Sequence, residues 1–150
     1  MKDIFITLGL SMLPISELRG AIPYGLSKSI PFITVFLISI LGNLLPAIPL
    51  YFFLERLLKF LEKFRWGIRF NNWLISRTKS KSKIIDIYKT IGLLIFVGIP
   101  LPMTGAWTGT VASIIFQLKF KNFLIGIIGG ILMAGIIVSL ITLGIRNILF

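Results

Sequence analysis

The sequence contains no cysteine and no histidine. Their absence excludes a disulfide, a thiolate nucleophile, an imidazole acid or base, and a zinc site built from Cys and His. Only five residues are acidic, so a cage of carboxylates around a metal ion is not expected either. The composition therefore argues against an enzyme, and it indicates no catalytic residues, no metal and no cofactor.

Charge is also scarce, since 14% of the 150 residues are charged whereas 56% are hydrophobic. Such a chain has too few polar side chains to cover a soluble domain, and it suits a bilayer. Nine of the 16 Lys and Arg residues lie between Arg56 and Lys83 and contribute most of the net charge of +11. The positive-inside rule explains this cluster, and no nucleic-acid-binding motif accompanies it. We therefore expect a multi-pass protein of the cell membrane whose partners are lipids and not nucleic acid.

Four hydrophobic stretches follow one another along the chain. Pro31–Leu54 and Asn122–Ile145 are uncharged, and as helices of 24 residues each would reach about 36 Å, enough to cross a hydrocarbon core of about 30 Å. Ile4–Leu26 and Thr90–Leu118 are instead interrupted, and each has two apolar arms of roughly ten residues, half the membrane thickness. We expect them to be re-entrant helical hairpins, with two kinked full crossings as the alternative. The expected hairpin breaks are Pro14, Pro23, Pro100, Pro102 and Gly105.

An internal repeat relates the two halves of the chain. Residues 36–47 and 123–134 are identical at seven of twelve positions, and residues 13–16 match 101–104 in the same order. A unit that crosses the membrane once ends on the opposite side, so its copy is inserted upside down. The expected fold class is therefore an all-α integral membrane protein with an inverted repeat, in which each half is a re-entrant helical hairpin plus one transmembrane helix. It forms a single membrane domain over 1–150, with repeat 1 at about 1–54, a basic connector at about 55–86 and repeat 2 at about 87–150.

The connector and the two long helices carry further patterns. Leu54 to about Ser76 reads as an amphipathic helix on the membrane surface, and its basic residues place it in the cytoplasm with both termini outside. Small residues recur at every fourth position in both long helices and predict close helix contacts. These stripes are Gly126, Gly130 and Ala134 in one helix and Ser39, Asn43 and Ala47 in the other. Asn43 is also a candidate for facing a substrate path.

The residues that could carry chemistry lie in the interrupted stretches. Glu17 and Arg19 would lie near the middle of the membrane, where a charged side chain faces a protein interior or a wet cavity. A buried carboxyl is a plausible proton acceptor, and a guanidinium can hold a phosphate or carboxylate bidentately. If the two breaks meet, they form a small polar site for a substrate or ion, whose members are Ser16, Glu17, Arg19, Thr104, Trp107 and Thr108. The alternatives are a structural ion pair for the two charges and a space-filling role for the indole.

A family resemblance rests on the same two segments. The runs Pro14-Ile15-Ser16-Glu17-Leu18-Arg19-Gly20-Ala21-Ile22-Pro23 and Pro100-Leu101-Pro102-Met103-Thr104-Gly105-Ala106-Trp107-Thr108-Gly109 resemble the small multidrug export protein family, which looks related to the DedA/VTT superfamily. The resemblance implies two re-entrant hairpins, each packed on a transmembrane helix. It also implies lipid-carrier movement and proton dependence, with Glu17 and Arg19 as the acidic and basic residues. The sequence departs from the family pattern at Met103, where glycine is usual.

The expected function is transport. We predict proton-coupled movement or flipping of a small amphiphile, such as an anionic lipid phosphate or a drug. Two crossings and two hairpins are few to enclose a path, so a homodimer is expected. The alternative is a membrane scaffold or assembly protein that transports nothing.

Overall fold

The computed structural model describes residues 1–61, 63–64, 67–69, 83–101 and 104–149. The described part consists of helices joined by short turns and contains no strand. Two short helices, α1 (Lys2–Met12) and α2 (Glu17–Ser27), are followed by the long helix α3 (Phe32–Leu61). After the connector come α5 (Lys83–Gly98), α6 (Ala106–Ile115) and the long helix α7 (Phe120–Leu149). The all-α prediction is confirmed, and the order of two shorter helices and one 30-residue helix occurs twice.

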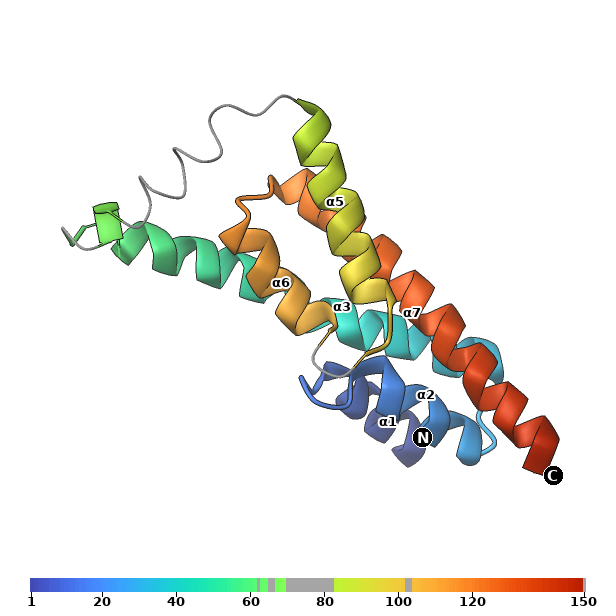
Figure 1. Ribbon diagram of the computed structural model, residues 1–150. Helices are drawn as coiled ribbons and strands as arrows, with labels where there is room; N and C mark the ends of the chain where they lie inside the picture. The colour runs from blue at the N-terminus through green and yellow to red at the C-terminus, as the bar shows by residue number, and fades with distance from the viewer. Residues whose placement is uncertain (62, 65–66, 70–82, 102–103, 150) are drawn as a thin grey trace.

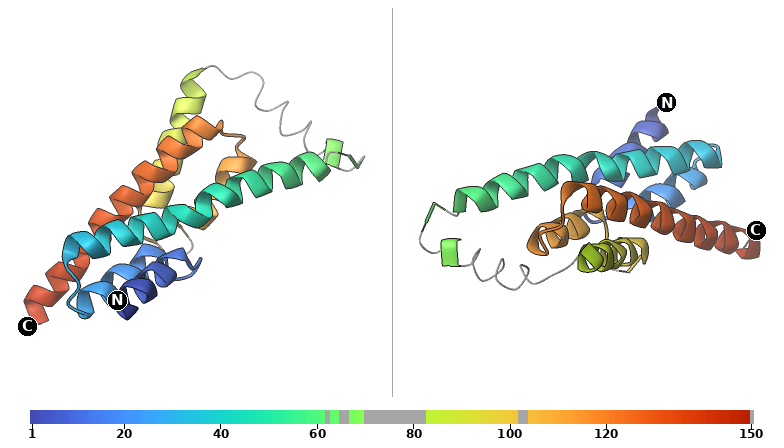
Figure 2. Two further views of the ribbon diagram at one scale, coloured as in Figure 1. Left: turned by 180° about the vertical axis from the view of Figure 1, so that it is seen from behind. Right: turned by 90° about the horizontal axis from the view of Figure 1, so that it is seen from above.

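The same pairs of helices pack together in both halves (Figure 1). Helix α1 lies against α2 and α3, and α5 lies correspondingly against α6 and α7. The halves are joined by contacts of α2 with α7, of α6 with α3, and between the two long helices. Both termini lie away from the ends of α3 and α5 that flank the connector (Figures 1 and 2).

Helices α3 and α7 are long and apolar enough to cross a membrane, over Phe32–Phe60 and Phe120–Ile145. Large apolar side chains point outward from both, as expected for a surface in contact with lipid. Examples are Leu37, Leu41 and Leu45 on α3 and Leu132, Ile136 and Leu140 on α7. The long helices therefore agree with the predicted membrane crossings in number and approximate position.

Small residues bring α5 and α7 close together. A Cβ added at Gly130 would lie 2.6 Å from Val97 Cβ and 2.9 Å from the Leu94 carbonyl oxygen, so only glycine fits there. Gly126 is similarly close to the Thr90 carbonyl oxygen. The predicted stripe on α7 thus forms its contact within the protomer. In the first half, Gly42 of α3 faces the α1 backbone at Leu8, and its counterpart in the repeat, Gly129, faces Leu94 of α5.

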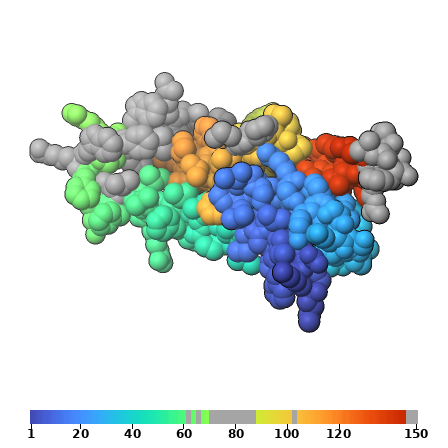
Figure 3. All heavy atoms as spheres, turned by 90° about the horizontal axis from the view of Figure 1, so that it is seen from below, coloured from blue at the N-terminus to red at the C-terminus, as the bar shows by residue number. Residues whose placement is uncertain are grey.

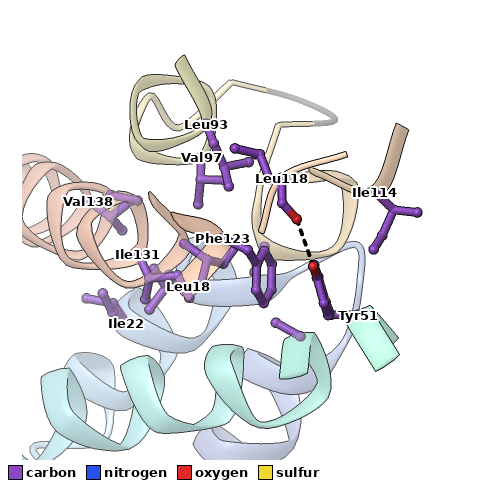
Figure 4. Packing of buried hydrophobic residues seen from close by; sticks show 14 of the residues in the cluster. Leu18, Ile22, Tyr51, Leu93, Val97, Ile114, Leu118, Phe123, Ile131 and Val138 are labelled. Carbon is purple, nitrogen blue, oxygen red and sulfur yellow. Dashed lines mark hydrogen bonds between the residues drawn. The ribbon is translucent and has the colours of Figure 1, made fainter. Parts of the chain in front are cut away.

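An aromatic cluster joins the two halves near the α6–α7 turn (Figure 4). Tyr51 of α3 is 5% exposed, stacks on Phe123 with ring centroids 4.4 Å apart, and donates its hydroxyl to the Leu118 carbonyl oxygen at 2.8 Å. The phenol therefore satisfies a polar atom of the turn in surroundings where water is excluded. This bond fixes the start of α7 against α3.

Two expected boundaries are corrected. Pro23 is not a hairpin break, because α2 continues through it from Glu17 to Ser27. A proline keeps a φ suited to a helix and removes one N–H, and this loss is tolerated where neighbouring helices pack around it. Helix α3 also continues past Leu54 to Leu61, so the expected surface helix begins as part of α3. The rest of that expected helix falls mainly outside the described residues.

Candidate functional site

Two turns interrupt the shorter helices and define the candidate site. The first separates α1 from α2 at Leu13–Ser16, and the second separates α5 from α6 at residues 99–105. Pro14, Pro100 and Gly105 lie in these turns as expected, whereas Pro102 lies outside the described residues. The Ser16 hydroxyl donates to the Leu10 carbonyl oxygen and closes the first turn, so its bond stays within the first hairpin.

Glu17 places a carboxylate at the first turn of α6. The side chain is 7% exposed, and its Oε1 accepts a hydrogen bond from the Trp107 backbone N–H at 3.4 Å. The first N–H groups of a helix have no partner inside the helix and carry the positive end of its dipole. The carboxylate of one hairpin therefore caps the helix of the other.

The backbone and a neighbouring glycine both hold Glu17 in this position. Its φ is 44°, in the left-handed region that non-glycine residues seldom occupy. A Cβ added at Gly105 would lie within about 2.5 Å of the Glu17 carboxyl carbon, so the carboxylate fills the space that a side chain would need. Gly105 is thus the close-contact residue of the second turn, and strain at Glu17 is the kind of outlier that marks functional sites.

Arg19 binds the second turn separately. Its Nη2 donates to the Thr104 carbonyl oxygen and, at 3.2 Å, to the Thr104 hydroxyl. Within the described part of the chain, no salt bridge joins Glu17 to Arg19, although the two charges act on each other electrostatically. Residues i and i+2 of a helix point in different directions, so the two side chains reach different partners.

Trp107 links the two turns from the other side. Its indole Nε1–H donates to the carbonyl oxygen of Met12, the last residue of α1, at 3.1 Å. The indole therefore satisfies a carbonyl at a helix end, and it does more than fill space. Three side chains, Glu17, Arg19 and Trp107, together bind backbone groups of the opposite hairpin.

Two of the expected site residues have other surroundings. The Thr108 hydroxyl donates to Gly105 O at 3.4 Å, within its own helix. Asn43 is 2% exposed on α3, and its Oδ1 has no hydrogen-bond partner in the described part of the chain. Neither the Thr108 bond nor the buried Asn43 amide connects to Glu17 or Arg19. The structure therefore gathers four expected residues at the meeting point: Glu17, Arg19, Thr104 and Trp107. Their binding role stays a prediction.

Arg19 lines a cavity of about 380 Å³. Pro23 and Pro100 line it beside the arginine, and α7 provides an apolar wall that sequence reasoning did not foresee. The wall consists of Val138, Ile141, Thr142 and Ile145. The cavity therefore combines a cationic side chain with an apolar wall, which suits an amphiphilic anion.

The site contains no recognisable metal centre. Among the residues that the structure describes, no three Asp or Glu side chains gather into a group that could hold a metal ion. Figure 3 shows the first hairpin (blue) lying beside α6 (orange) and α7 (red) on one face of the molecule. The polar groups of the site are thus arginine, glutamate, threonine, an indole and backbone.

These features define a helical membrane protein in which two interrupted segments meet at a buried glutamate and a half-buried arginine. The family model described as "Putative small multi-drug export protein" matches residues 17–137, and the chain belongs to that family. No curated protein and no solved structure matches the chain. The family match supports the resemblance found in the sequence and a general role in membrane transport.

Proposed function

We propose that the protein is a proton-coupled membrane transporter that moves or flips an amphiphile carrying an anionic group, such as a lipid phosphate. The observation that carries the proposal is that Arg19 lines a mostly apolar cavity and lies two residues from the buried carboxylate of Glu17. The family description supports transport in general, and drug-like amphiphiles are a second class of substrate.

Arg19 is the proposed anion-binding residue. Its two bonds to Thr104 both start from one Nη nitrogen, and a guanidinium has five N–H donors in a planar fork. The remaining donors can hold a phosphate or carboxylate, while Val138, Ile141 and Ile145 contact the apolar part of the same molecule.

Glu17 is the proposed proton acceptor. Burial disfavours its negative charge, and the N-terminal end of α6 and Arg19 offset this only in part. Protonation removes this charge, weakens the cap on α6, and leaves Arg19 as the dominant charge for an anionic substrate. Proton binding would thereby be coupled to the contact between the hairpins and to anion binding.

The proposed membrane arrangement has two re-entrant hairpins, α1–α2 and α5–α6, in inverted halves with α3 and α7 crossing the bilayer. The repeated order of helices and the position of both termini away from the connector support it. The basic connector would be cytoplasmic and the termini outside. Because two crossings and two hairpins are few to enclose a path, we propose a homodimer.

The test is movement of a fluorescent phosphatidylglycerol between the two leaflets of liposomes that contain the purified protein and carry a pH gradient. Glu17→Gln keeps the shape and part of the hydrogen bonding, so it should insert and bind lipid but lose the pH-driven component. Arg19→Lys should weaken binding of the anionic lipid, because a point charge does not replace a planar fork. Full activity of Glu17→Gln, combined with failure of Glu17→Ala to accumulate, would make Glu17 a structural cap only.

A membrane scaffold or assembly protein is the second candidate. It is favoured by the fact that Glu17, Arg19 and Trp107 all use hydrogen bonds to hold the two hairpins together. If the wild-type protein moves neither phosphatidylglycerol nor a cationic dye such as ethidium in liposomes, the scaffold function replaces the transporter.

A further inference from the structure

A second groove lies between α5 and the C-terminal part of α6. Its volume is about 340 Å³, within the range of small ligand sites. The walls are almost entirely apolar and come from both helices of the second hairpin. They include Gly92, Leu93, Phe96, Ala112, Phe116 and Leu118.

The groove exists because α5 and α6 diverge away from their turn (Figure 1). Near the turn the helices touch, and a Cβ added at Gly109 would overlap Val97. One and a half turns earlier along α5, Gly92 is exposed, and a Cβ there would meet nothing within 4 Å. The space beside Gly92 is therefore open to a ligand and can also be filled by a larger side chain without conflict.

One lysine, Lys89, lines the part of the groove that is farther from the turn along α5. It donates from Nζ to the Phe116 carbonyl oxygen at 2.6 Å. Lys119 directly follows Leu118, another lining residue. The groove thus combines an apolar interior with a cationic end.

We propose that this groove binds one acyl chain of an anionic phospholipid, whose headgroup lies at Lys89 and Lys119. The inference rests on the proposed re-entrant placement of the hairpins. Lys89 precedes the end of α5 at Gly98 by nine residues, a rise of about 14 Å. If the turn lies near the midplane of a core of about 30 Å, Lys89 lies at the headgroup boundary. The connector end would face the cytoplasmic leaflet, where anionic lipids are concentrated.

The test is native mass spectrometry of the purified full-length protein in detergent, with equal amounts of phosphatidylglycerol and phosphatidylcholine added. The wild type should retain phosphatidylglycerol preferentially, by about fivefold for each lysine that contacts the headgroup. Gly92→Leu fills the groove and should lose one retained phosphatidylglycerol per protomer. Gly9→Leu is the matched control, because Gly9 is also an exposed helix glycine with nothing within 4 Å of its Cβ position.

Lys89→Gln should reduce the preference for phosphatidylglycerol, but it also removes the bond to Phe116, so Gly92→Leu is the decisive variant. Unchanged retention in Gly92→Leu, or equal retention of the two lipids by the wild type, would overturn the proposal. A change of oligomeric mass in Gly92→Leu without loss of lipid would instead assign the groove to a second copy of the chain. None of these readouts needs transport, so loss of pH-driven movement in Glu17→Gln is judged separately.

Discussion

Alanine at Gly130 tests the close contact between α5 and α7. The new methyl carbon would lie 2.6 Å from Val97 Cβ and 2.9 Å from the Leu94 carbonyl oxygen. Because the second of these atoms is backbone, the two helices must move apart, and overpacking of this kind costs about 1–3 kcal/mol. Alanine also stabilises a helix by roughly 1 kcal/mol relative to glycine, which partly offsets the clash.

Gly144→Ala separates these two effects. Gly144 lies on the same helix, is exposed, and has nothing within 4 Å of its Cβ position. This variant should be as stable as the parent or slightly more stable, and Gly130→Ala should be less stable than Gly144→Ala by about 1–3 kcal/mol. For a chain of this size the difference corresponds to about 2–12 °C in the midpoint of thermal unfolding.

The measurement is the fraction of each detergent-solubilised variant that remains monodisperse in size-exclusion chromatography after heating. Equal midpoints for the Gly130 and Gly144 variants would mean that α5 and α7 do not approach as closely as the structure has them. The reasoning about the small-residue stripe would then be wrong.

Three further predictions concern the membrane topology, the Tyr51 hydrogen bond and the contact of Gly105 with Glu17. Single cysteines introduced at Lys2, Ser80 and Leu149 should not all be labelled from the same side of the membrane. The cysteine at position 80 should react from one side, and those at positions 2 and 149 from the opposite side. Labelling of all three from one side would favour full crossings. Tyr51→Phe leaves the buried Leu118 carbonyl oxygen without its donor and should lower stability by about 1–3 kcal/mol in the same heating assay, while a smaller loss would indicate that another donor replaces the phenol. Gly105→Ala should displace the Glu17 carboxylate and reduce transport to the level of empty liposomes, and an active variant would contradict the need for this contact.

The positions of the helices could be predicted from the apolar stretches, because a membrane requires long uncharged runs and prolines interrupt them. Helix α3 begins at Phe32 and α7 at Phe120, within two residues of the expected starts. Their ends extend further than expected, to Leu61 and Leu149. A charged residue marks the edge of a hydrophobic run, but it does not end a helix, so charge was a poor criterion for these boundaries.

The two prolines of the first interrupted stretch show what local sequence could not decide. Pro14 lies in the turn, whereas Pro23 lies inside α2. Both remove one backbone N–H, and the outcome depends on whether neighbouring helices pack around the altered backbone. That information belongs to tertiary packing, so residue type alone gave the wrong assignment for Pro23.

The charged members of the candidate site could be identified because charges are rare in apolar stretches, but their partners could not. Glu17 binds the backbone N–H of Trp107, Arg19 the carbonyl oxygen of Thr104, and Trp107 the carbonyl oxygen of Met12. Every residue except proline has these backbone groups, so a sequence carries no sign of which of them is bound. The sequence indicated which residues a meeting of the two turns would bring together, but the meeting itself and the pattern of bonds required the structure.

Glu17 combines two properties that two different substitutions separate. Its carboxylate fills the space above Gly105, and its charge caps α6. Glu17→Gln removes the charge but keeps nearly the same volume, whereas Gly105→Ala keeps the charge but fills the space that the Glu17 carboxylate occupies. If transport depends on a proton that moves on and off this carboxylate, both variants must lose the pH-driven component. If the residue only holds the hairpins together, Glu17→Gln stays active, since an amide oxygen still accepts the Trp107 N–H, and only Gly105→Ala is impaired.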